Sequence, residues 1–167
     1  MLVRKTLWLG AGLGVLLLFA GELGFAAGKT LVNIQITCPL TGDPEPVIRT
    51  APGGQVRLQE VTCQESGMTI NGVAAVKDDM LAAGFVESSG SLQASGYTIG
   101  NFADGKSQYL AVWKEQGSGT GLTIELRFER GTGVAQGIKG KVKIECTVPP
   151  PGSPEVCHGK GYYVLEP

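Results

Sequence analysis

The chain has 167 residues with a formal net charge of −1, and it contains 26 glycines and one histidine. Nucleic-acid-binding and anionic-lipid-binding proteins usually carry a basic stripe, so this mild charge argues against both classes of partner. The nearest approach to such a stripe is Lys139, Lys141 and Lys143, whose alternation is typical of the solvent face of a strand.

Residues 1–28 have the three parts of a secretory signal peptide. Arg4 and Lys5 form a charged start, Leu7–Phe19 form an apolar stretch, and small residues between Gly24 and Gly28 suit cleavage. The apolar stretch has about 13 residues, fewer than the roughly 20 that a membrane-spanning helix needs. We therefore expect the segment to be removed after export.

Cleavage after Gly28 leaves residues 29–167, which is close to the usual size of one domain. No second long apolar run follows, so we expect no membrane span in the mature protein. The sequence thus predicts a secreted or periplasmic protein with a single domain.

Apolar residues of the mature part recur with period two, which is typical of strands with one dry and one wet face. The predicted strands are Val32–Cys38, Gln55–Cys63, Met68–Lys77, Tyr97–Phe102, Ser107–Lys114, Leu122–Phe128, Val142–Cys146 and Gly161–Leu165. Glycine-containing turns separate several of them, with Asp104-Gly105 the strongest hairpin signal. Only Asp78–Ala83 suggests a short helix, which Asp78 or Asp79 would cap and Gly84 would end.

All four cysteines lie in the predicted mature part. In an exported chain an even number of cysteines favours disulfides, and four cysteines allow three pairings. We favour Cys38–Cys63 and Cys146–Cys157, because each cysteine then pairs with its nearest neighbour in sequence.

The most individual stretch is the glycine-rich segment Arg130–Lys141. Its GTGxxxG pattern does not predict a phosphate-binding loop, because an alternating strand follows it where such a loop would open a helix. Together with Asp104-Gly105, Tyr109, Trp113 and the closing Gly159–Tyr163, it resembles bacterial secreted barrels of the allene-oxide-cyclase and dirigent kind, which are relatives in shape of the lipocalins. The resemblance covers residues 96–165.

This resemblance implies an all-β fold, namely a single antiparallel eight-stranded closed barrel whose interior can hold a small apolar molecule. A β-sandwich is the alternative, since about eight or nine strands in one sheet must either close or split to avoid exposed edges. The acidic catalytic residues of the plant members have no motif match in the chain, so the resemblance implies no activity.

Cofactor and metal motifs are incomplete. Cys157-His158 ends like a haem-attachment motif, but the first cysteine of C-x-x-C-H would fall at Pro154. His158 is the single histidine, and zinc needs three or four ligands. The acidic pairs Asp78-Asp79 and Asp43-x-Glu45 are interpreted as solvated carboxylates of loops. We therefore expect neither a cofactor nor a metal.

Four aromatic residues, Tyr97, Tyr109, Trp113 and Phe128, are the candidates for lining a ligand cavity. The interpretation that we favour is that they fill the interior, because an eight-stranded barrel is only just wide enough for side chains or for one small ligand.

Three functional hypotheses follow. The first is an exported non-catalytic barrel that binds a small hydrophobic molecule or acts as a stable secreted module. The second is an assembly or adhesion subunit whose strand Leu31–Thr37 completes a neighbour's sheet. The third is a cyclase- or isomerase-like enzyme, for which Tyr109 or Glu60 would supply a buried polar group beside a cavity.

Overall fold

The computed structural model describes residues 28–39, 47–118, 121–147, 150 and 153–167. The predicted signal peptide, Gly28 apart, lies outside these residues, as does the Asp43-x-Glu45 pair. Within them, no helix is long and apolar enough to cross a membrane.

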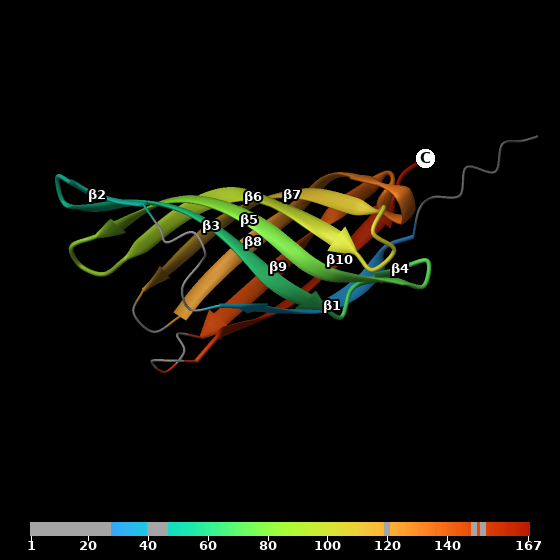
Figure 1. The fold of residues 1–167 in the computed structure, drawn as a ribbon, viewed down its shortest axis with the longest axis horizontal. Coiled ribbons are helices and arrows are strands. Elements are labelled where there is room, and N and C mark those ends of the chain that lie inside the picture. The colour runs from blue at the N-terminus through green and yellow to red at the C-terminus, as the bar shows by residue number, and fades with distance from the viewer. Residues whose placement is uncertain (1–27, 40–46, 119–120, 148–149, 151–152) are drawn as a thin grey trace, which may run out of the picture.

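The described residues form an all-β barrel (Figure 1). Its elements are β1 (Thr30–Cys38), β2 (Val47–Ala51), β3 (Gly54–Ser66), β4 (Thr69–Ile70), β5 (Val73–Glu87), β6 (Leu92–Phe102), β7 (Gln108–Ser118), β8 (Gly121–Thr132), the 3₁₀ turn η1 (Gly133–Ala135), β9 (Ile138–Thr147) and β10 (Glu155–Leu165).

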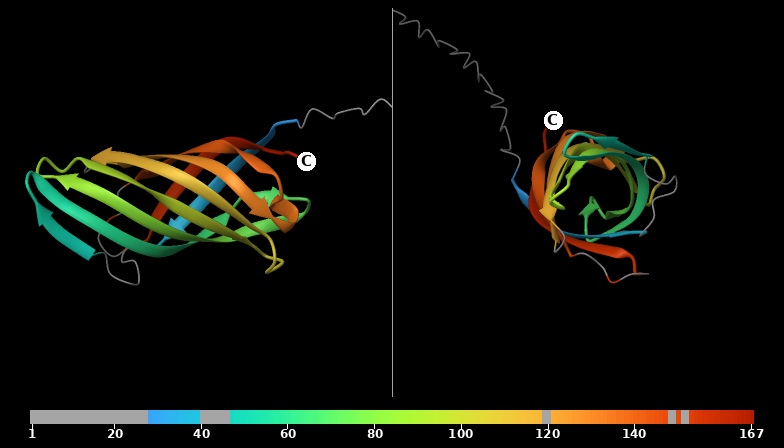
Figure 2. Two further views of the ribbon diagram at one scale, coloured as in Figure 1. Left: turned by 90° about the horizontal axis from the view of Figure 1, so that it is seen from above. Right: turned by 90° about the vertical axis from the view of Figure 1, so that its left-hand side faces the viewer.

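Eight of these strands close into a ring in the order β3, β1, β10, β9, β8, β7, β6 and β5, with β5 pairing back to β3. The view along the barrel shows this ring directly (Figure 2, right). All pairings are antiparallel, and the short strands β2 and β4 are additions to β3 and β5. The predicted eight-stranded closed barrel is confirmed, and the sandwich alternative is not.

The core follows from the alternation that the sequence predicted. On β1, Val32, Ile34 and Ile36 are buried while the residues between them are exposed, and on β9 Val142 and Ile144 behave in the same way. Apolar side chains from all sides of the ring thus fill the barrel, and their removal from water is the main term that favours the folded state.

One end of the barrel is covered by the segment before β5. Met68 and Ile70 are fully buried, and the Tyr163 hydroxyl of β10 donates a hydrogen bond to the carbonyl of Thr69 at 3.3 Å. β10 and β5 are far apart in the ring, so this segment crosses the end of the barrel. The opposite end carries the β2–β3 and β5–β6 hairpins (Figure 1, left).

The helix predicted at Asp78–Ala83 is wrong, because these residues lie in the middle of β5. There Asp78 is buried and Leu81 and Ala83 are exposed, with β3 on one side and β6 on the other. The local helix signals of a capping Asp and an Ala-Ala pair are overridden by pairing on both edges, since strand formation depends more on context than on propensity.

The strand predicted over Met68–Lys77 is instead a tight hairpin. Asn71 and Gly72 have φ angles of 50° and 80°, so they form a turn between β4 and β5. Asn-Gly is the preferred pair for a two-residue hairpin turn because both residues tolerate a positive φ. The predicted turn at Asp104-Gly105 also joins β6 to β7, but it is longer, and only Gly105 has a positive φ, of 66°. Asp104 stabilises this turn by accepting hydrogen bonds from the backbone N–H groups of Lys106 and Ser107.

Two disulfides, Cys38–Cys63 and Cys146–Cys157, connect neighbouring strands. This is the predicted pairing. Cys146 and Cys157 lie directly opposite each other on β9 and β10. Cys38 and Cys63 extend the pairing of β1 with β3, which otherwise consists of three residue pairs from Gln35 to Thr37.

Candidate functional site

The barrel contains a cavity of about 300 Å³, whose lining reaches Gly84 and Leu92 beside the β5–β6 hairpin. Its wall is mainly apolar. The apolar side chains include Ile36, Val61, Met80, Ala82, Ala94, Leu122, Ile124, Leu126 and Ile144. A cavity of this size and lining is at the lower end of what small-molecule sites usually have.

Two buried polar atoms in the cavity wall lack a hydrogen-bond partner within the described part of the chain. They are Thr98 Oγ1 and Trp113 Nε1, and the two residues are 1% and 3% exposed. Buried polar groups are rarely left unpaired, because each costs about 1–3 kcal/mol. Both residues line the cavity, so a small rotation of either side chain would offer its polar atom to a bound molecule.

Trp113 fits against the wall because Gly96 lies opposite it on β6. A Cβ atom at position 96 would lie 2.6 Å from the indole ring and 1.9 Å from the carbonyl oxygen of Leu81. The missing side chain thus lets the large indole lie flat against the inner surface of the sheet.

Three charged side chains, Arg57, Glu115 and Glu155, line the same cavity near the ends of their strands. All three are half-buried. Burial and then the charge of Glu155 raise the pKa of Glu115 to about 7, although Arg57 acts in the opposite direction. Burial also raises the pKa of Glu155.

A second polar group lies deeper in the barrel and consists of Glu65, Asp78 and Tyr109 (the acid–tyrosine cluster), none of which lines the cavity. The Tyr109 hydroxyl oxygen is 2.7 Å from Asp78 Oδ1 and 2.9 Å from Glu65 Oε2. The three residues are 5%, 0% and 2% exposed, so the barrel shields them from bulk solvent.

The geometry of this cluster fixes its protonation. A tyrosine hydroxyl has one proton to donate, so with two carboxyl neighbours it donates to one and accepts from the other. The accepting position requires a protonated carboxyl. Burial, followed by the charge of Asp78, raises the pKa of Glu65 well above its ordinary value, while burial raises the pKa of Asp78 to about 6. The stronger rise in pKa identifies Glu65 as the carboxyl that holds the shared proton, with Tyr109 donating to Asp78.

The aromatic packing around Tyr109 holds the cluster in place. The ring makes edge-on contacts with Phe102 and Phe128, with centroids 6.2 Å and 5.1 Å away. Gly100 lies opposite Tyr109 on β6, and a Cβ atom there would come within 2.0 Å of the ring. Burial raises the pKa of the Tyr109 hydroxyl well above its usual value, so it stays protonated.

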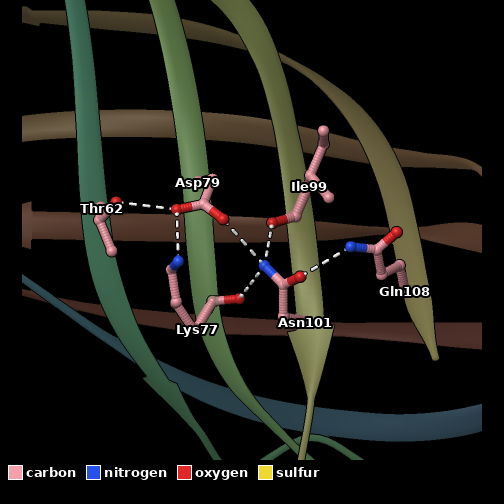
Figure 3. Close-up of polar contacts among 6 residues, drawn as sticks. All are labelled: Thr62, Lys77, Asp79, Ile99, Asn101 and Gln108. Carbon is pink, nitrogen blue, oxygen red and sulfur yellow. Dashed lines mark hydrogen bonds and ion pairs between the residues drawn. The ribbon is translucent and has the colours of Figure 1, made fainter. Parts of the chain in front are cut away.

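Asp79 faces the other way from Asp78 and belongs to a polar network on the outer surface (Figure 3). It accepts hydrogen bonds from Thr62 and Asn101 and pairs with Lys77, at 2.8, 3.0 and 3.0 Å. Burial opposes ionisation of Asp79, but the hydrogen bonds from Thr62 and Lys77 outweigh it and lower the pKa. Two consecutive carboxyls thus have opposite pKa shifts because successive residues of a strand face opposite sides.

The four predicted cavity residues have different places. Trp113 lines the cavity, whereas Tyr109 and Phe128 fill the interior beneath it. Tyr97 does not point inward at all, since it lies on the outer face of β6 and is 57% exposed. Tyr97 faces outward because the inward positions of β6 are the even-numbered residues from Ala94 to Phe102.

The acidic residues of the interior were missed or misjudged by the sequence predictions. Asp78 is not a solvated loop carboxylate but a fully buried one. Glu65 lies two residues beyond the inward-facing Cys63, and Glu115 lies two residues beyond Trp113. The signal that could have found Glu65 and Glu115 is the period-two pattern itself. If the pattern is continued beyond the apolar residues of β3 and β7, both glutamates fall on the inward face.

One group of metal-type ligands occurs among the described residues, namely Cys146, Glu155 and Cys157. Its two sulfur atoms form a disulfide with each other and are not thiolates, the form in which cysteine binds metals. The outer lysines Lys139, Lys141 and Lys143 are exposed, as their alternation predicted.

Comparison with known proteins establishes the fold of the chain. No family model and no curated protein matches the chain. Among solved structures, the pterocarpan synthase dirigent proteins PsPTS1 and GePTS1 are 11% and 12% identical, each with a TM-score of 0.52. The alignments cover 84% and 83% of this chain and 97% and 86% of those chains.

A protein of unknown function of the DUF3224 family, from Shewanella oneidensis MR-1, is similar to the same degree. It is 14% identical with a TM-score of 0.52, and the alignment covers 84% of this chain and 98% of that one. The described residues thus have a dirigent-like barrel fold. The expected resemblance to dirigent barrels is confirmed at the level of fold.

Proposed function

We propose that the chain is an exported, non-catalytic β-barrel protein that binds one small, mostly apolar molecule in its cavity. The observation that carries the proposal is the cavity of about 300 Å³ with a mainly apolar wall. Its lining includes Thr98 and Trp113, whose Oγ1 and Nε1 atoms have no hydrogen-bond partner among the described residues. Ligand sites commonly combine an apolar wall with a few polar atoms that orient the bound molecule.

Export is supported by two independent features. Residues 1–28 have the composition of a signal peptide. Two disulfides join strands of the barrel, and disulfides persist mainly in oxidising compartments outside the cytosol.

The groups named for an enzyme are badly placed to act on a molecule in the cavity. The acid–tyrosine cluster, which contains Tyr109, does not line it, and Glu60 is exposed on the outer face of β3. A shared fold at 11–14% identity transfers no activity from the dirigent proteins. This favours binding over catalysis.

Strand donation to a neighbour is also disfavoured. β1 pairs with β10 over nine residues and with β3 over three, so the segment proposed for donation completes the chain's own barrel. Its release would open the ring.

The test uses the full chain, expressed with residues 1–28 and purified from the exported fraction, where intact mass should show a first residue near Lys29. Trp113 is then the only tryptophan, since the other is Trp8. Its fluorescence therefore reports directly on the cavity wall. The probe is N-phenyl-1-naphthylamine, which is neutral and apolar, and saturable quenching of Trp113 with energy transfer to the probe is expected.

A matched pair of substitutions locates the probe. Ala82→Phe fills the cavity and should weaken binding by about tenfold or more, equivalent to about 1.4 kcal/mol. Ala83→Phe makes the same change on the exposed outer face of β5 and should leave affinity unchanged. Failure of the unaltered protein to bind, or equal binding by both variants, would contradict the proposed function.

A further inference from the structure

The mouth of the cavity, defined as Arg57, Glu115 and Glu155, has an excess of negative charge that the described residues do not neutralise. Glu115 and Glu155 come from β7 and β10, and the cavity lies between them. Within the described part of the chain, neither carboxylate has an ion pair or a hydrogen bond, and the single cation at the mouth is Arg57.

This arrangement is electrostatically unfavourable without a partner. Two half-buried carboxylates that repel each other are costly to ionise, and the raised pKa of Glu115 reflects both burial and the charge of Glu155. A positive group between them would relieve the repulsion and would replace the hydration that burial has removed.

The wall beneath the mouth suits the same kind of molecule. Trp113 lies two residues before Glu115 on the inward face of β7, and its indole is the aromatic surface that best attracts a cation. Further inside, the polar residues of the lining are Gln59 and the buried Thr98, and the remaining side chains there are apolar. The cavity thus offers anionic, aromatic and then apolar surfaces in order from mouth to interior.

We propose that the ligand is an amphipathic organic cation, an amine or quaternary ammonium, whose charged group lies between Glu115 and Glu155 and whose apolar body enters the cavity. This inference rests on the proposed function and names the class of molecule that it concerns. An anionic ligand is disfavoured because Arg57 is outnumbered by the two glutamates.

The experiment compares three molecules with one hydrocarbon body and different head groups, namely 4-phenylbutylamine, 4-phenylbutan-1-ol and 4-phenylbutanoate. Each is titrated against the processed protein with Trp113 fluorescence and calorimetry. We expect the amine to bind about tenfold or more tighter than the alcohol, and the carboxylate to bind most weakly.

The dependence on pH is a second readout that needs no variant. The charged groups that face Glu115 across the cavity are Arg57 of β3 and Glu155 of β10, while its neighbours on β6 and β8, Ala94 and Ile124, are uncharged. Binding of a cation requires ionised Glu115, so affinity for the amine should rise between pH 6 and pH 8. Affinity for the alcohol should stay constant.

Substitutions then test whether the two glutamates of the mouth cause the preference for the amine over the alcohol. Glu115→Gln and Glu155→Gln should each weaken amine binding by about fivefold or more without changing alcohol binding. Glu125→Gln, on the exposed outer face of β8, is the matched control and should change neither. Near-UV circular dichroism verifies that each variant retains its fold.

The outcomes separate the two proposals. Equal binding of amine and alcohol, or tightest binding of the carboxylate, would overturn the cation assignment and leave the apolar-ligand function standing. No binding of any of the three, together with no binding of N-phenyl-1-naphthylamine, would remove the proposed function itself.

Discussion

At the scale of single residues, the acid–tyrosine cluster shows how position within a strand determines the chemistry of a carboxyl. Asp78 and Asp79 differ only in the side of β5 on which they lie, yet burial raises the pKa of one while surface partners lower the pKa of the other. Sequence predicted neither outcome, because the local helix signals at Asp78–Ala83 concealed the alternation. Tyr109 and Trp113 were predicted to be inside because aromatic residues alternate clearly on β7.

The protonation of Glu65 leads to a prediction at this scale. Glu65→Gln keeps a donor for the Tyr109 oxygen, so the free energy of unfolding at pH 7 should change by less than about 1 kcal/mol. Glu65→Ala removes the donor and leaves unpaired buried atoms, so it should cost about 2–3 kcal/mol. Chemical denaturation measures both.

The control for this pair is Glu60→Ala on the exposed face of the same strand, which should stay within about 0.5 kcal/mol of the unaltered protein. Equal destabilisation by the Gln and Ala variants of Glu65 would show that the carboxyl is ionised and would contradict the proposed sharing of protons.

At the scale of elements, the pairing of β1 with β3 is the seam of the barrel. It has three residue pairs, whereas β3 pairs with β5 over eleven and β9 with β10 over nine. Cys38–Cys63 covalently joins the two strands next to those three pairs. Sequence predicted the disulfide, since proximity along the chain favoured it, but not its place at the seam, which depends on strand order.

Removal of the two disulfides should therefore have similar global and different local effects. The linked residues are 25 and 11 positions apart, for which loop-closure entropy gives roughly 3.5 and 3 kcal/mol. Cys38→Ala with Cys63→Ala should also increase amide exchange along β1, because few other bonds hold the seam. Cys146→Ala with Cys157→Ala should leave that exchange low. Hydrogen exchange with mass spectrometry measures the difference, and unchanged protection of β1 in the first variant would argue against a weak seam.

At the scale of the whole molecule, several interior carboxyls make stability depend on pH. The pKa values of Asp78 and Glu115 are about 6 and about 7 in the folded protein, above the value of about 4 for exposed carboxyls. At a pH between about 4 and about 7, these two carboxyls have lost their protons in the unfolded chain but still hold them, wholly or in part, in the folded protein. Raising the pH through this window therefore destabilises the fold.

The thermal midpoint should accordingly be higher at pH 5 than at pH 8, at constant ionic strength. Asp79, Asp104 and Glu145 have lowered pKa values and act in the opposite direction, but only at more acidic pH. Glu115→Gln should flatten the upper part of the profile. A midpoint that rises from pH 5 to pH 8 would be inconsistent with this account of the interior.

The fold as a whole was predictable because period-two alternation and glycine turns recur along β1 and from β6 to β10. The cavity was not, because its volume depends on how far opposite walls of the ring stand apart and on small residues such as Ala82 and Gly96. The alternation within one strand predicts neither the distance between opposite walls nor which small residues face each other across the barrel.

The ring joins the first strand of the barrel to its last, with Thr30 opposite Tyr163. A growing or translocating polypeptide cannot complete this circle until its final segment has emerged, so folding has to wait for nearly the entire chain. Such long-range closure slows folding. It also favours an extended, transport-competent state for as long as the tail is still being made.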